Sequence, residues 1–186
     1  MKNYLSLLLC ITCTFTINAQ ILITAEEEYT PQIGVLVSML NDMKNRVERT
    51  VGDLNTKEID FLLDENANSI GTLIMHLAAT EKMYQVRTFE NRLFNEEEEK
   101  EWSTAMSMGK AAQEKYKGKD IKEYLKILSN VRETTLHYFK THDDTWLAKV
   151  DEKLNMNYHW AWYHVMEHQS SHLGQILLLK KRISKS

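Results

Sequence analysis

Proline and glycine are scarce in this chain, and this scarcity restricts its fold more than any other feature. The 186 residues include one proline and six glycines. Both residues interrupt helices and supply the tight turns on which β folds depend. The length suits one domain with a buried hydrophobic core. We therefore expect an all-α protein that is largely helical and free of sheet.

Four segments carry apolar residues at helical spacing, and sequence signals mark where they begin. Thr30 offers a capping hydroxyl and Pro31 follows at the tolerated first helical position. Further start signals are Asn68-Ser69, a capping box of Asp120 with Glu123, and Asn157. The four helices are expected at residues 30–52, 68–90, 120–139 and 157–182.

The second and third of these helices are separated by a long link. It has roughly 30 residues, whereas neighbouring antiparallel helices need about 2 to 8. A link of this length lets the third helix run parallel to the second, which predicts an up-down-down-up four-helix bundle. The acidic run from Glu96 to Glu99 falls within the link and is interpreted as a solvated loop.

The first residues have the pattern of a signal peptide. Lys2 supplies a positive start, the stretch from Tyr4 to Ile17 is apolar or small and uncharged, and Ala19 ends it. The apolar run is shorter than the roughly 20 residues of a spanning helix, which argues against a retained anchor. We expect a signal peptide at 1–19, one domain at 20–186, and an exported protein, periplasmic or secreted.

Both cysteines, Cys10 and Cys13, lie in this leader, so the mature chain has no thiol for catalysis or metal binding. Neither follows Ala or Gly, which disfavours a lipoprotein. The formal charge is −3 without a basic stripe, so no nucleic-acid partner is expected. The expected partner is a small-molecule substrate, and a homodimer stays open.

Three histidines recur at intervals of four residues in one phrase, His164-Val-Met-Glu-His168-Gln-Ser-Ser-His172. This spacing stacks side chains on one helix face, where two imidazoles can bind one metal ion. His76 lies in the most apolar helix, where an imidazole without a partner would be costly to bury. A lone histidine is more often a hydrogen-bonded core or surface residue. The pair together with His76 favours a metal site.

The remaining histidines and the neighbouring polar residues are less informative. His137, His142 and His159 have no such pattern and are interpreted as structural or exposed. Glu81 and Glu167 are near the candidate ligands in sequence, but spacing does not show that either transfers a proton. Gln175 lies one turn beyond His172 and is a candidate hydrogen-bond partner of that histidine. Four aromatic residues fit either a pocket mouth or the core: Tyr158, Trp160, Trp162 and Tyr163.

Two stretches, residues 66–81 and 162–176, resemble helices of the DinB superfamily. The first has a histidine after an Ile-Gly-x-Leu-type phrase, and the second has His-x-x-x-His followed by x-Gly-Gln. The resemblance covers the chain from about residue 30 onward and implies one divalent metal ion bound by His76, His168 and His172. His164 falls on a non-ligating position, and Leu173 replaces a frequent arginine of the family.

Three neutral imidazoles leave an open position on a divalent ion, as in catalytic rather than structural sites. Such an ion can activate water, polarise a carbonyl or hold a thiolate. Histidine sites suit several metals, with zinc or nickel the first expectation. The superfamily includes thiol-dependent transferases, but export would separate the protein from cytosolic thiols. We therefore expect a metal-dependent hydrolase, with a thiol-dependent transferase or a non-catalytic metal- or ligand-binding stress protein as alternatives.

Overall fold

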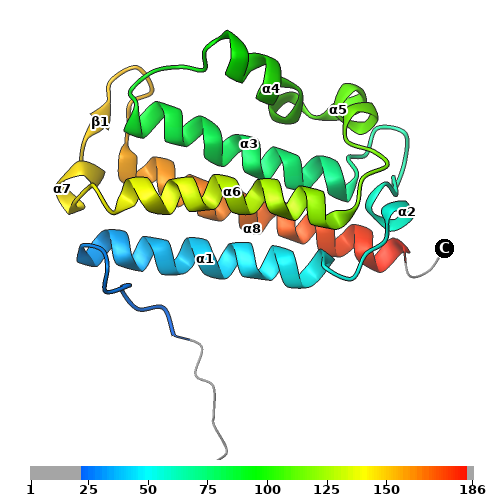
Figure 1. Cartoon of the computed structure of the whole chain (residues 1–186), viewed down its shortest axis with the longest axis horizontal. Helices are drawn as coiled ribbons and strands as arrows, with labels where there is room; N and C mark the ends of the chain where they lie inside the picture. The colour runs from blue at the N-terminus through cyan, green and yellow to red at the C-terminus, as the bar shows by residue number, and fades with distance from the viewer. Residues whose placement is uncertain (1–21, 184–186) are drawn as a thin grey trace, which may run out of the picture.

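The computed structural model of the protein describes residues 22–183 (Figure 1). The predicted signal peptide and its cleavage after Ala19 lie outside these residues. The helices and strands in chain order are α1 (Pro31–Val51), α2 (Thr56–Ile59), α3 (Ile70–Phe89), α4 (Glu96–Ser107), α5 (Gly109–Lys115), α6 (Ile121–Phe139), α7 (Asp144–Leu147), β1 (Val150–Asp151), β2 (Met156–Asn157) and α8 (Tyr158–Ile183).

Four long helices, α1, α3, α6 and α8, form the body of the molecule and confirm the all-α prediction in its main feature. Helix α3 packs against α6 and α8, and α1 packs against the same two helices. In Figure 1 the colour advances from left to right along α1 and α8, and from right to left along α3 and α6. The four predicted helices agree with the observed ones to within about two residues.

The helix starts follow the predicted capping signals in all but one case. Ser69 accepts a hydrogen bond from the backbone of Thr72, and Asp120 forms its capping box with Glu123. At α1 the Thr30 side chain makes no cap. Instead, Asp144 of α7 accepts from the backbone N–H groups of Gln32 and Ile33, each at 3.1 Å. The start of α1 is thus satisfied by a carboxylate more than 100 residues away in sequence.

The acidic run in the long link is helical, so its interpretation as a loop was wrong. It forms the first turn of α4, where Asn95 and Glu98 complete a capping box. Carboxylates are stabilised at the positive end of a helix. The hydrogen bond from Arg92, together with the cap, lowers the pKa of Glu98 to about 2 although desolvation opposes this. The link therefore contributes a helix that packs on α3.

The prediction of a chain free of sheet was also wrong at one point. Strands β1 and β2 form a two-residue antiparallel hairpin, in which Val150 pairs with Asn157 and Asp151 with Met156. Asn155 takes a left-handed conformation at the turn, with φ of 50°, which asparagine tolerates better than most residues. Asn157 then caps α8 as predicted, because its side chain accepts from the Trp160 backbone at 2.8 Å.

The core consists of two hydrophobic clusters with buried polar side chains near their junction. Glu81 of α3 and Arg132 of α6 form a two-pronged ion pair, with both N···O distances at 2.7 Å. Thr135 donates to Glu81 at 2.6 Å, and the Gln169 amide bonds both members of the pair at 3.3 Å. We call these four residues the Glu81 network; it links α3, α6 and α8.

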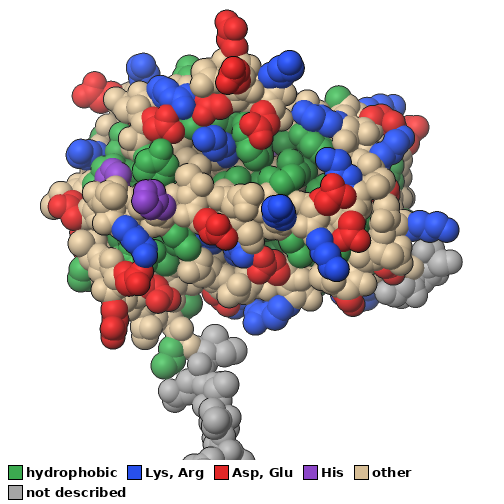
Figure 2. Space-filling view, in the orientation of Figure 1, with side chains coloured by type: hydrophobic (Ala, Val, Ile, Leu, Met, Phe, Trp, Pro, Cys, Tyr) green, Lys and Arg blue, Asp and Glu red, His purple; other side chains and the backbone are tan. Residues whose placement is uncertain are grey.

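Among the described residues, no helix is both long and apolar enough to cross a bilayer. On the face seen in Figure 2, Lys and Arg side chains are interspersed with Asp and Glu rather than gathered in a stripe.

Candidate metal centre

The three predicted ligands lie together, although they come from two helices. His76 projects from α3, and His168 and His172 project from adjacent turns of α8. The Nε2 atom of His168 lies 3.2 Å from that of His76 and 3.1 Å from that of His172. One ligand atom from each of the three residues lies within 4.8 Å of the others. We call these three residues the histidine cluster.

Hydrogen bonds on the outer side fix the orientation of two of the rings. The Nδ1 atom of His76 donates to the carbonyl oxygen of Ala105 in α4, at 2.9 Å. The Nδ1 atom of His172 donates to the side-chain oxygen of Gln175, at 3.0 Å, as the sequence predicted. Since both partners are oxygen acceptors, a ring with a single proton carries it on Nδ1 and turns its Nε2 lone pair inward.

A positive partner would suit the inward-facing lone pairs. His168 can offer at most one Nε2 proton, so it can satisfy one of its two neighbours and not both. Taking up further protons is unfavourable, because burial and the neighbouring imidazoles lower the pKa of His168 to about 3. Burial likewise lowers the pKa of His76. A divalent cation would satisfy all three nitrogen atoms.

The spacing of the nitrogen atoms fits such an ion. Three nitrogen atoms bound to zinc at about 2.0–2.1 Å in tetrahedral geometry lie roughly 3.3 Å apart. The two distances to His168, 3.2 and 3.1 Å, are close to this value, and the three ligand atoms all lie within 4.8 Å of one another. The three residues could therefore supply the ligands of one ion.

The carboxylates near the cluster in sequence are engaged elsewhere. Glu81 is fully buried in its pair with Arg132. Glu167 lies 2.7 Å from Nδ1 of His164, one turn before His168. His164 also stacks on Trp160 with ring centroids 5.0 Å apart, so it is outside the cluster, as predicted. Neither glutamate is placed to serve as the base of a reaction at the histidine cluster.

Two buried polar atoms near the cluster have no hydrogen-bond partner. They are Nδ1 of His168 and the hydroxyl of Thr80. Thr80 follows His76 by one helical turn on α3 and is 5% exposed. Buried polar groups are nearly always paired, so an unpaired one next to a candidate site indicates a missing ligand or water.

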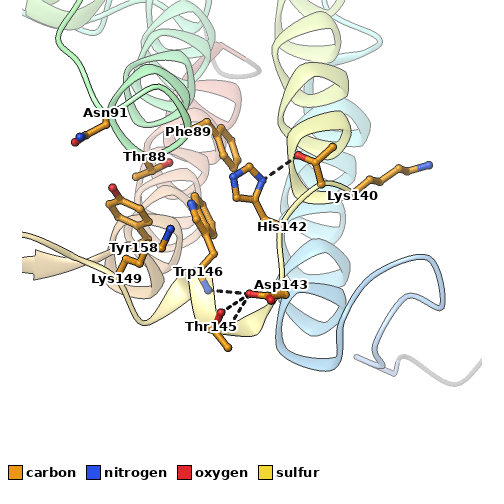
Figure 3. Close-up of a pocket in the computed structure, with 11 residues that line it drawn as sticks. Thr88, Phe89, Asn91, Lys140, His142, Asp143, Thr145, Trp146, Lys149 and Tyr158 are labelled. Carbon is orange, nitrogen blue, oxygen red and sulfur yellow. Dashed lines mark hydrogen bonds between the residues drawn. The ribbon is translucent and has the colours of Figure 1, made fainter.

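The other histidines are structural or exposed, as predicted. His142 packs against Phe89 and Trp146 (Figure 3). Its Nδ1 atom donates to the Tyr138 carbonyl at 2.8 Å. It lines a surface hollow of about 730 Å³ between α3 and the α6–α7 connection. No residue of the histidine cluster lines this hollow.

The four aromatic residues at the start of α8 divide between the core and the surface. Trp162 and Tyr158 are buried in the core, at 0% and 7% exposure. Trp160 and Tyr163 are half-exposed, at 47% and 49%. Leu173, which replaces a frequent arginine of the DinB pattern, is buried in the core and supplies no charge at the site.

The helical frame and the histidine cluster together define a DinB-like protein. Residues 35–185 match the family described as Mycothiol-S-transferase (MST), and the chain belongs to this family. The comparison with curated proteins gives no match. A solved structure described as the conserved protein of locus from Enterococcus faecalis shares the fold, with a TM-score of 0.63 and 13% identity over 82% of this chain and 96% of that one.

Sequence reasoning missed one part of the centre, the Ala105 carbonyl that orients His76. A backbone acceptor has no side-chain signature, and the segment carrying it had been interpreted as a loop. The capping box of Asn95 and Glu98 was the signal that could have revealed helix α4.

Proposed function

We propose that this protein is a metal-dependent transferase that joins a low-molecular-weight thiol to a second small molecule. His76, His168 and His172 would hold one divalent ion, with zinc or nickel the first candidates. The observation that carries the proposal is the convergence of three Nε2 atoms whose outer nitrogen atoms, at His76 and His172, are held by acceptors. The up-down-down-up four-helix bundle would be the frame that brings α3 and α8 together.

A bound ion would supply positive charge with an open coordination position, able to stabilise a thiolate or polarise a substrate oxygen. The protein's part is to hold three neutral donors, so that the charge of the ion is not cancelled. Ala105 and Gln175 keep the Nδ1 protons on the outer side and thereby orient two of the rings.

The sequence analysis favoured hydrolysis. Two observations now support transfer instead. The chain belongs to a family named for transfer to a thiol. In addition, Glu81 and Glu167 are both paired, so neither is free to activate water as a general base. A thiol bound to such an ion would release its S–H proton to solvent without such a base, and the thiolate sulfur would then displace a leaving group from the second molecule.

Hydrolysis is the second candidate, and the leader favours it. The pattern of Lys2, the apolar stretch from Tyr4 to Ile17 and Ala19 supports an exported protein, which would be separated from cytosolic thiols. Mass spectrometry of the protein recovered from the periplasm or medium should find an N-terminus at Gln20. Intact Met1 in the cytoplasm would remove the reason for preferring hydrolysis.

A reconstitution assay tests the proposed function. The metal-free protein is loaded with zinc, nickel or manganese and offered a thiol, such as cysteine, with an electrophile; ester and amide substrates are assayed in parallel. We expect metal-dependent consumption of the thiol that is lost in His76→Ala. Metal-dependent ester or amide cleavage without thiol consumption would favour hydrolysis. Metal binding without any turnover would indicate a non-catalytic binding protein.

A further inference from the structure

We propose that a surface hollow between the β1–β2 hairpin and the start of α8 binds a neutral, apolar part of the substrate. This inference rests on the proposed function, because it assigns a substrate class to the same centre. The hollow has a volume of about 550 Å³, and we call it the hairpin hollow; it is lined by Tyr84, Leu154, Asn155, Met156, Asn157 and Trp160.

The lining of the hairpin hollow suits an uncharged ligand. None of its six residues is an acid, a lysine, an arginine or a histidine. Burial raises the pKa of the Tyr84 phenol, which therefore stays neutral. Leu154 and Trp160 are large apolar side chains that are 46% and 47% exposed. A charged ligand would find no counter-charge here, whereas an apolar group would cover exposed apolar surface.

A continuous series of rings connects the hairpin hollow to the histidine cluster. Trp160 stacks on His164, with ring centroids 5.0 Å apart and planes 9° from parallel. The ring of His164 lies 5.6 Å from that of His168. Tyr84 meets the same His164 ring edge-on at 6.0 Å. The hollow is therefore two ring-to-ring steps from a candidate metal ligand.

The unpaired hydroxyl of Thr80 lies along the same path. Thr80 is four residues after His76 and four before Tyr84, so all three share one face of α3. His76 meets His168 on this face, and Tyr84 meets His164. Thr80 thus lies on α3 between a residue of the cluster and a residue that lines the hollow. A ligand that reached from the hollow to the cluster would pass a buried hydroxyl that has no hydrogen-bond partner.

The hairpin that walls the hollow is held in place by an ion pair. Arg87 of α3 donates from Nε to Asp151 of β1 at 2.8 Å, and both side chains are largely buried. Asp151 also accepts from the backbone of Lys153 and Leu154, across the turn. Although burial acts in the opposite direction, these bonds lower the pKa of Asp151. The hairpin wall of the hollow is therefore fixed to α3.

Hydroxamates with different tails test this inference on the zinc-loaded full chain. Acetohydroxamate reports an accessible ion, and phenylalkyl hydroxamates of increasing length report the hollow. Calorimetry measures the affinity of each hydroxamate. We expect a neutral phenyl tail of sufficient length to raise the affinity at least tenfold over that of acetohydroxamate. The matching carboxyphenyl tail should raise the affinity less than threefold. Trp160→Ala and Leu154→Asp should each reduce the tenfold gain to below threefold. Tyr163→Ala, an equally exposed aromatic residue outside the hollow, should retain the gain.

A metal-independent probe separates failure of this inference from failure of the proposed function. N-phenyl-1-naphthylamine, a neutral fluorescent dye, should bind saturably to both wild type and His76→Ala, and at least tenfold more weakly to Trp160→Ala. If acetohydroxamate does not bind zinc-loaded wild type, the proposed function is overturned. The hairpin hollow is not a substrate site if the dye has the same affinity for Trp160→Ala as for Tyr163→Ala. The same conclusion follows if the phenyl tail adds no affinity.

Discussion

The Glu81 network and the histidine cluster are two buried polar groups that share helices α3 and α8, yet they are built in opposite ways. In the network, donors face acceptors: Arg132 donates twice to Glu81, and Thr135 and Gln169 add further bonds. In the cluster, acceptors face acceptors, because the Nε2 lone pairs of His76 and His172 both point at His168. The first arrangement is complete within the protein, and the second is one that a cation could complete.

This difference separates a structural role from a functional one. A buried group whose hydrogen bonds are satisfied holds helices together and offers nothing to a ligand. A buried group left unsatisfied costs stability and persists where a ligand completes it. The comparison therefore predicts that damage to the network lowers stability, whereas damage to the cluster lowers metal content.

The largest effect on stability is expected from Arg132→Ala. The change leaves the Glu81 carboxylate fully buried without its counter-ion, which costs about 3–5 kcal/mol. Urea denaturation followed by circular dichroism measures the loss. The double variant Glu81→Met/Arg132→Met removes both charges and should recover most of the stability. A loss below about 1 kcal/mol in Arg132→Ala would show that the network is not structural.

A smaller effect, on the metal rather than on the fold, is expected from Gln175→Ala. The change removes the acceptor that orients His172, and loss of such partners typically lowers metal affinity by about 10- to 100-fold. Competition with a chromophoric chelator measures the affinity. Gln175→Glu keeps an acceptor at this position and should stay closer to wild type. Equal affinities for wild type and Gln175→Ala would mean that the Gln175 contact does not influence the ion.

The third predicted effect is negligible at neutral pH and concerns the pH dependence of the metal-free protein. Burial and the neighbouring imidazoles lower the pKa of His168 to about 3, whereas in the unfolded chain it is about 6.5. The unfolded state therefore binds more protons below pH 6.5. The free energy of unfolding should fall as the pH decreases from 6.5 toward 3, by up to about 1.4 kcal/mol per pH unit for this group. Below pH 6.5, the free energy of unfolding should fall less steeply with decreasing pH in His168→Leu than in wild type. The same slope in both proteins would contradict the lowered pKa of His168.

Most of the helical frame could be predicted because it depends on local signals. The capping box of Asp120 and Glu123 and the hydroxyl of Ser69 act within one turn, and both helices begin where these residues indicate. The start of α1 could be located but not explained, since its cap comes from Asp144 in a distant helix. Helix α4 was missed because four successive glutamates were interpreted as solvated, whereas their position after Asn95 makes them a helix start.

The candidate site was predictable to the extent that its chemistry is carried by side chains with a helical spacing. The four-residue spacing of His168 and His172 indicates a shared helix face, and the apolar residues around His76 indicate that it is buried. Which residues complete the environment could not be predicted, because these contacts are tertiary. The Ala105 carbonyl on His76 and the pairing of Glu81 with Arg132 become visible when the helices are packed together.

Elemental analysis of purified protein tests the central claim, that the histidine cluster holds one divalent ion. The comparison uses wild type and the single variants His76→Ala, His168→Ala, His172→Ala and His164→Ala, with circular dichroism to confirm that each is folded. We predict close to one ion per chain in wild type and His164→Ala, and loss of most of the metal in the other three while helicity is retained. Equal metal content in wild type and folded His76→Ala would contradict the three-histidine site.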